Sequence, residues 1–218
     1  MQQSTQFNVY DKESAAFFHQ YMKKYPKLYQ NLVNILQREI PDSETQQRIL
    51  DIGMGPGLLL EEIQKKFPQA CILGIDQSQA MIQQAQKKTI QNAHILQANA
   101  EALPVCSNTI DAITCRFVLY AVKNPLKAIQ ELYRIIKPKG ILVIEGLNKQ
   151  YPQWKKNLVR VQMKLKQAPA AVIAYHYDAY NDAYDVEELI RLLQQTGFQI
   201  KNVRTKPKNW KYLIIASK

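Results

Sequence analysis

The stretch that decides the fold is a short apolar run that ends in a glycine-rich turn, Ile49-Leu50-Asp51-Ile52-Gly53-Met54-Gly55-Pro56-Gly57. Such a run is typical of a buried strand, and residues 58–67 predict a helix directly after the turn. Glycines at a strand-to-helix turn let the backbone approach a ligand closely. The same residues also suit a tight turn without a ligand, so the motif alone leaves both interpretations open.

A carboxylate follows the next apolar run. Residues 70–75 predict a second strand that ends at Asp76, and Ser78 is expected to cap a helix that runs to about residue 88. Asp76 can accept hydrogen bonds from two ribose hydroxyls, or it can stabilise the helix N-terminus. The glycine spacing differs from the Gly-x-Gly-x-x-Gly of dinucleotide-binding folds, and no P-loop Lys-Ser/Thr pair follows. Together, the turn and Asp76 indicate a nucleoside-containing cofactor.

The rest of the chain alternates between strands and helices. Apolar runs predict strands at 94–96, 110–115, 141–145, 198–204 and 210–216, and helices at 125–136 and 186–195. Continuous apolar strands between helices are typical of a parallel sheet that is covered on both faces. We therefore expect an α/β fold with a doubly wound, mostly parallel, seven-stranded, Rossmann-like sheet, with N-terminal helices and a helical lid inserted after strand five.

Length and composition indicate a single globular domain. The chain has 218 residues, of which 46% are hydrophobic and 22% are charged. We expect a helical cap in 1–46, a cofactor-binding core in 47–146, a lid in 147–184, and a closing helix and strands in 185–218. No apolar run reaches the roughly 18 residues of a membrane span, and the polar N-terminus does not resemble a secretory signal. Three cysteines at unrelated spacings favour reduced thiols and a cytoplasmic location.

The net charge of +11 comes entirely from residues 119–218, because residues 1–118 hold 11 basic and 11 acidic side chains. The predicted helix at about 153–166 lies in an acid-free stretch, 146–177. Its apolar residues share one face and its basic residues another: Trp154, Leu158, Val161 and Leu165 against Lys156, Arg160 and Lys164. This helix can be a lid with a solvated basic face, or it can lie on an anionic membrane surface and deliver an apolar acceptor. Binding of RNA or another polyanion is the least favoured interpretation.

Residues 47–146 resemble the class I S-adenosylmethionine-dependent methyltransferases in four segments that occur in strict order. These are the first motif at 49–57, a ribose-binding segment at 74–81, an adenine-side segment at 97–104 and the turn into strand five at 136–142. The nearest branch contains the ubiquinone/menaquinone biosynthesis C-methyltransferases, which are similar at Gln97 to Pro104. The chain departs from that branch at Lys139, where a glycine is usual, and at 117–122, which lack the Arg-Asn pair of the quinone enzymes.

The resemblance implies S-adenosyl-L-methionine as the cofactor and methyl transfer to a small-molecule acceptor by direct displacement. It places Asp51 and the turn near the methionine part, Asp76 at the ribose, and Arg116 beside the cofactor through its backbone. The N-terminal helices are expected to close over the sulfonium, with Tyr10 as a lid residue or simply a packed aromatic. The full set of expected cofactor-binding residues is Tyr10, Asp51, Gly53, Gly55, Pro56, Gly57, Asp76, Gln77, Asn99, Ala100 and Arg116.

Displacement at a sulfonium methyl needs mainly proximity and alignment, and it needs a general base only when the nucleophile carries a proton of high pKa. The candidate bases are His176, within a tyrosine-rich segment at 175–184, and His19 on the N-terminal helix. Either histidine can equally be a packed or surface residue, and the tyrosines suit an aromatic pocket or plain packing. No residues at metal-ligand spacing are visible. Two alternatives stay open: a membrane-associated quinone or lipid methyltransferase, and a non-catalytic or nucleic-acid-binding protein on the same fold.

Overall fold

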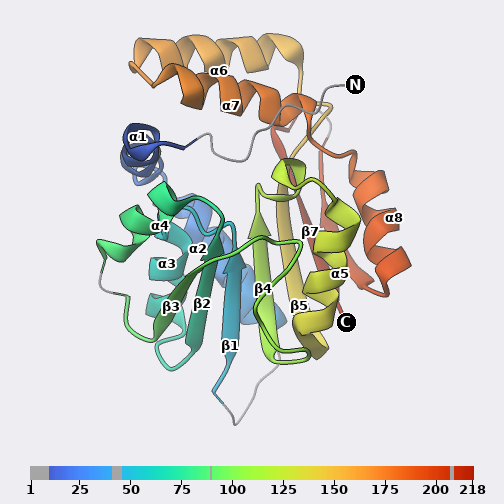
Figure 1. The fold of residues 1–218 in the computed structure, drawn as a ribbon. Coiled ribbons are helices and arrows are strands. Elements are labelled where there is room, and N and C mark those ends of the chain that lie inside the picture. The colour runs from blue at the N-terminus through green and yellow to red at the C-terminus, as the bar shows by residue number, and fades with distance from the viewer. Residues whose placement is uncertain (1–9, 41–45, 89, 207–208) are drawn as a thin grey trace.

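The computed structural model describes residues 10–40, 46–88, 90–206 and 209–218, and the side chains of Tyr175, Tyr177 and Asp178 lie outside the description. A seven-stranded sheet of order β3-β2-β1-β4-β5-β7-β6 forms its centre (Figure 1). The strands are β1 (Arg48–Ile52), β2 (Cys71–Asp76), β3 (Ala93–Gln97), β4 (Ile110–Arg116), β5 (Ile136–Leu147), β6 (Gln199–Arg204) and β7 (Lys211–Ser217).

Strands β1 to β5 pair in parallel, whereas β7 runs antiparallel to both β5 and β6. The prediction of a mostly parallel seven-stranded sheet is therefore confirmed. The strand order reverses beside β1, which has β2 on one side and β4 on the other. In sheets of this type, ligands bind at the carboxyl ends of the strands next to such a reversal.

Helices cover both faces of the sheet, as Figure 1 shows. One face packs against α2 (Pro26–Glu39), α3 (Leu58–Lys66) and α4 (Gln79–Gln86), and the other against α5 (Pro125–Ile135) and α8 (Val186–Thr196). Alternate residues of β1 pack into the two cores: Ile49 faces α2, α3 and α4, and Leu50 faces α5 and α8. Burial on both faces explains why the run at residues 49–52 is apolar without a break.

Three helices lie above the carboxyl edge of the sheet (Figure 1): α1 (Lys12–Met22), α6 (Gln153–Leu165) and α7 (Ala170–Asn181). Below them, a one-turn 3₁₀ helix, η1 (Leu119–Ala121), follows β4. Met163, Val172 and Ile173 form a small buried cluster that packs against Phe17 of α1. We refer to α6 and α7 together as the roof. Most of the tyrosine-rich segment belongs to α7, although the sequence did not predict a helix there.

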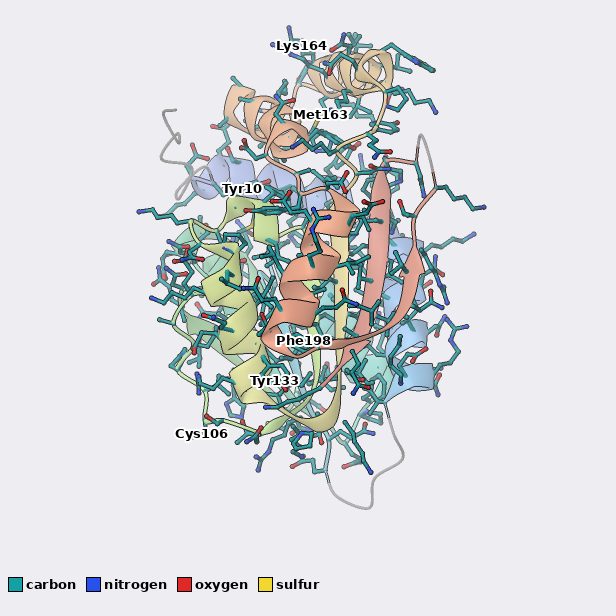
Figure 2. The ribbon with its side chains drawn as sticks, turned by 90° about the vertical axis from the view of Figure 1, so that its right-hand side faces the viewer. Tyr10, Cys106, Tyr133, Met163, Lys164 and Phe198 are labelled. Atoms are coloured by element: carbon teal, nitrogen blue, oxygen red, sulfur yellow. The ribbon has the colours of Figure 1, made fainter. Side chains whose placement is uncertain are left out.

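Helix α6 is oriented differently from a lid helix with a solvated basic face. Four of its apolar residues are exposed on the outer side: Trp154, Leu158, Val161 and Leu165. In contrast, Lys156 is only 8% exposed, with its Nζ 5.2 Å from the ring centroid of Tyr180. In Figure 2, Lys164 projects from the outer side of α6. The expectation of a solvated basic face is therefore wrong for Lys156, because its long alkyl chain and cation are covered by the aromatic ring on α7.

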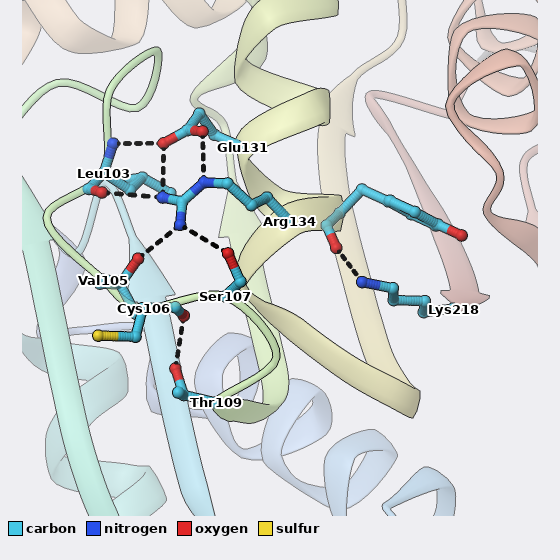
Figure 3. Close-up of polar contacts among 9 residues, drawn as sticks. Leu103, Val105, Cys106, Ser107, Thr109, Glu131, Arg134 and Lys218 are labelled. Atoms are coloured by element: carbon cyan, nitrogen blue, oxygen red, sulfur yellow. Dashed lines mark hydrogen bonds and ion pairs between the residues drawn. The ribbon is translucent and has the colours of Figure 1, made fainter.

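A polar network fixes the segment between β3 and β4 (Figure 3). Arg134 of α5 donates to the carbonyl oxygens of Leu103 and Val105, and it pairs with Glu131, whose carboxylate accepts the Leu103 N–H at 2.8 Å. These bonds attach the middle of the segment to α5. Its first residues, from Ala98 onward, are thereby held beside the carboxyl end of the sheet.

Candidate active site

A cavity of about 610 Å³ lies between the carboxyl edge of the sheet and the helices above it. On the sheet side it is lined by the turn after β1, the end of β2 and the end of β4. On the helix side it is lined by residues of α1, α2 and α7, most of them aromatic. The cavity therefore has a floor that carries the charged groups Asp51, Asp76 and Arg116, and a largely aromatic cover.

The glycine turn is shaped by two different requirements. Gly53 has a φ of +65°, and a Cβ there would lie 2.1 Å from a methyl carbon of Val118, so only glycine fits. Gly55 has a φ of +56° and would meet nothing within 4 Å, which leaves open space at the floor of the cavity. Gly57 caps α3 and lies outside the cavity lining. The turn thus combines one packed glycine with one that leaves room for a ligand.

Asp76 joins the turn to the next helix. Its two carboxylate oxygens accept the Gly55 N–H and the Ser78 N–H, each at 2.8 Å. Burial raises the pKa of Asp76, and the hydrogen bonds from Ser78 and Gly55 oppose that shift. A carboxylate has about four acceptor positions, so Asp76 keeps acceptor capacity for groups in the cavity. That arrangement suits a pair of ribose hydroxyls.

Asp51 is buried at the end of β1, with 2% of its surface exposed, and its Oδ1 accepts a hydrogen bond from the Thr114 hydroxyl at 2.6 Å. Burial raises the pKa of Asp51 to about 7, although the bond from Thr114 and the charge of Arg116 both act to lower it. An ammonium group in the cavity would favour the ionised form of this carboxyl.

Arg116 supplies a positive charge at the end of β4. Its Nε donates to Glu145 at 2.7 Å, and its guanidinium lies 4.5 Å from the ring centroid of Tyr29 and 4.9 Å from that of Phe117. Lys211 pairs with the second oxygen of Glu145. The buried Nη2 of Arg116 has no hydrogen-bond partner in the part of the chain that the structure describes. A buried guanidinium with a spare donor beside a cavity is suited to a carboxylate ligand.

The floor therefore fits each part of S-adenosyl-L-methionine. Arg116 can bind the carboxylate, Asp51 the ammonium and Asp76 the ribose, while Ala98 and Ala100 offer apolar surface to the base. Gln77, Pro56 and Tyr10 also line the cavity. Asn99 does not: it is exposed, and its side chain accepts the Glu101 N–H. The sequence-based set missed Ala98, although the two-residue period of an extended chain places it on the same side as Ala100.

The two candidate bases lie in different surroundings. His176 of α7 lines the cavity, and its ring centroid is 5.5 Å from that of Tyr180. His19 of α1 is not part of the lining, and the charges that act on it come from Lys88, Glu61, Lys23 and Lys87. Among the described residues, no cluster of three histidine, cysteine, aspartate or glutamate side chains could hold a metal ion. Of the two candidate bases, His176 is thus the one that lies where a ligand in the cavity could contact it.

Comparisons with known proteins agree with this geometry. Residues 18–203 match the family model described as a methyltransferase domain. The ubiquinone/menaquinone biosynthesis C-methyltransferase UbiE of Vibrio parahaemolyticus is 30% identical over 167 residues, which are 70% of this chain and 64% of that relative. The matched region is thus less than two thirds of the relative's length.

Two solved structures share the fold. A putative S-adenosyl-L-methionine-dependent methyltransferase from Methanococcus maripaludis has a TM-score of 0.70 at 23% identity, and covers 100% of this chain and 96% of its own. The plantazolicin methyltransferase BpumL, solved in complex with SAH, has a TM-score of 0.71 at 18% identity and covers 94% of each chain.

A doubly wound sheet with this floor defines a protein that binds a nucleoside-containing cofactor. The chain belongs to the methyltransferase domain family, within the class I S-adenosylmethionine-dependent methyltransferases and near UbiE. S-adenosyl-L-methionine is accordingly its cofactor.

The raised pKa of Asp51 leads to a prediction about cofactor binding. Binding of S-adenosylhomocysteine, which carries the same ammonium, should ionise Asp51 and release about half a proton at pH 7, because a group with a pKa of about 7 is half protonated there. Affinity should therefore rise with pH through 7 and then level off. Calorimetry in buffers of different ionisation enthalpy measures the released proton directly.

The matched control for this measurement is Asp51→Asn, which keeps the shape of the side chain but cannot ionise. The dependence of the binding enthalpy on the buffer should disappear in this variant. An unchanged dependence would show that the proton comes from another group.

Proposed function

We propose that the protein transfers the methyl group of S-adenosyl-L-methionine to an apolar, ring-bearing small molecule that binds between the floor and the helices α1 and α7. The observation that carries this proposal is the aromatic lining of the cover. The residues concerned are Phe18, Tyr21, Tyr25, Tyr29, Phe117, Tyr120, Tyr151, Tyr180 and Trp210. Flat, mostly apolar rings favour an acceptor that is itself flat and apolar.

The chain's own residues would act mainly by position. When bound, the cofactor supplies an electrophilic methyl group on a positively charged sulfur. The floor would fix that end of the cofactor, while the aromatic cover would exclude water and favour the positive charge. His176 is held beside the cavity, and burial lowers its pKa, so its imidazole is neutral at pH 7 and able to accept a proton from the acceptor.

The names of the relatives support an acceptor with a lipid-soluble ring, since ubiquinone and menaquinone biosynthesis concerns such molecules. The chain lacks the Arg-Asn pair of those enzymes at residues 117–122. We therefore propose a wider class, lipid-soluble phenols and quinols. The nucleic-acid-binding alternative has less support, because the cavity cover is apolar.

An acceptor assay in detergent solution tests this proposal. Radioactive methyl groups should move from the cofactor into organic-extractable products of lipid-soluble phenols or quinols, and hydrophilic amines should stay unlabelled. Trp210→Leu should raise the KM for the acceptor about tenfold, because it removes one aromatic wall of the cavity. Affinity for S-adenosylhomocysteine should change little.

The matched control is Trp154→Leu, which removes the other tryptophan from the outer surface of α6 and should leave the KM for the acceptor unchanged in detergent. Labelling of hydrophilic acceptors alone, or equal effects of the two tryptophan variants, would contradict the proposed acceptor class.

A further inference from the structure

The outer face of α6 carries an unusual row of apolar side chains. Trp154, Leu158, Val161 and Leu165 are 66%, 51%, 51% and 79% exposed. At 3.6 residues per turn these four positions fall within a stripe roughly 60° wide. Large apolar residues scattered singly over a surface are ordinary, but a contiguous row along a helix indicates a surface that contacts something. We refer to these four residues as the outer row.

The outer row is fixed in this orientation by the opposite side of the helix. Met163 is 5% exposed within the cluster that joins the roof to α1, and Lys156 lies over the Tyr180 ring. Rotation of α6 to bury the outer row would expose Met163 and break the contacts with α7. The row therefore stays on the surface for as long as the roof is packed.

Basic residues border the outer row on both sides. On an ideal helix, Lys155 lies about 100° to one side of Trp154, and Arg160 and Lys164 lie about 80–120° to the other. Lys166, at the end of the helix, has its Nζ 4.9 Å from the ring centroid of Tyr21 on α1. Residues 146–177 hold six basic residues and no acidic one. A central apolar stripe between two cationic borders is the pattern of a helix that lies in the plane of a membrane interface. There the apolar residues enter the acyl region and the cations reach the lipid headgroups.

We infer that the outer row and its basic borders dock the protein on the surface of an anionic lipid bilayer. A second copy of the chain is a poorer partner. Two such faces would bring their cationic borders together, and residues 146–177 hold no acidic side chain to compensate the repulsion. A nucleic acid would use the cations but would leave the four apolar side chains in water. None of the described helices is long and apolar enough to cross a membrane, so the contact is with the surface.

The docking face lies directly behind the acceptor side of the cavity. Helix α7, which packs against the inner side of α6, contributes His176 and Tyr180 to the lining. Docking would therefore bring the aromatic cover close to the layer in which lipid-soluble rings dissolve. This link to acceptor supply rests on the proposed function, whereas the docking itself does not.

Vesicle binding tests docking without cofactor or acceptor. The full chain is mixed with phosphatidylcholine vesicles, with or without phosphatidylglycerol, and then sedimented. We expect binding to the anionic vesicles at low salt and release near 1 M salt, where the Debye length falls to about 3 Å. In a Trp210→Phe background, Trp154 is the sole tryptophan, and its fluorescence should shift to the blue on binding and be quenched by lipid-attached quenchers.

Matched variants separate the outer row from general surface effects. The double variant Leu158→Gln with Leu165→Gln should weaken binding to the anionic vesicles by about tenfold or more. Leu96→Gln with Val203→Gln, at two apolar residues that are 40% and 36% exposed elsewhere, should not. Arg160→Glu with Lys164→Glu should abolish the anionic preference, while Lys127→Glu with Arg191→Glu, which changes the net charge equally, should largely keep it.

Three results would overturn the inference. They are no vesicle binding at low salt, a self-associated protein in which Trp154 is already buried in the absence of lipid, and tighter binding to an oligonucleotide that the leucine variants leave unchanged. Methyl transfer in detergent is measured separately. Failure of docking would thus leave the proposed function standing, and failure of methyl transfer would leave docking standing.

Discussion

Replacement of His176 by glutamine is expected to lower kcat about a hundredfold when the acceptor loses a proton of high pKa, since a positioned base contributes roughly 10²–10⁴. The affinity for S-adenosylhomocysteine should stay close to that of the wild type, because His176 belongs to the cover and not to the floor. Steady-state kinetics and calorimetry on the same preparation measure the two quantities.

The pH profile gives an independent readout of the same group. Burial lowers the pKa of His176 below its ordinary value of 6.5. The neutral, proton-accepting form therefore predominates at pH 7, and kcat should fall as the pH drops through the lowered pKa. The glutamine variant should lose this acid limb. His19→Gln is the matched control, since His19 lies outside the cavity lining, and equal losses in both variants would refute the role of His176.

Replacement of Asp76 by alanine should weaken the binding of S-adenosylhomocysteine about a hundredfold. The variant loses two charge-assisted hydrogen bonds to the ribose, each of which contributes about 1.5–3 kcal/mol at most, and the two losses are not additive. The variant also leaves the Gly55 N–H without the 2.8 Å hydrogen bond that it donates to Asp76. Isothermal titration calorimetry measures the change.

Asp182→Ala is the control for Asp76→Ala, because it removes the same charge from an exposed site outside the cavity lining. Its affinity for S-adenosylhomocysteine should match that of the wild type. A loss of less than about threefold in Asp76→Ala would show that the ribose is held elsewhere, since even one charge-assisted bond exceeds that factor.

The fold was readable from the sequence because its signals are local. Apolar runs that are buried on both faces predicted the inner strands β1, β4, β5 and β7. Asn124, Ser78 and Asp185 cap α5, α4 and α8 through their side chains. The glycine turn and Asp76 could be placed together because parallel strands bring their carboxyl ends to one edge.

The other features depend on tertiary contacts that no local pattern records. An amphipathic pattern shows that α6 has two faces, but only the contacts of Met163 and Lys156 with the rest of the roof decide which face points inward. The spare donor of Arg116 follows from the geometry of its bond with Glu145, 29 residues further along the chain. Asn99 stands between two cavity-lining alanines, but its side chain is exposed and accepts the Glu101 N–H, a local turn contact that the motif does not reveal.

The separation between the floor and the cover of the cavity has a consequence for the evolution of such a protein. The groups that fit the cofactor lie on the ends of β1, β2 and β4, whereas much of the cover comes from α1, α2, α7 and the loop between β5 and α6. Substitutions in residues 147–184 can therefore alter acceptor choice and surface attachment without disturbing the cofactor groups. One scaffold can in this way acquire new substrates through the helices above the sheet while the groups that fit the cofactor stay unchanged.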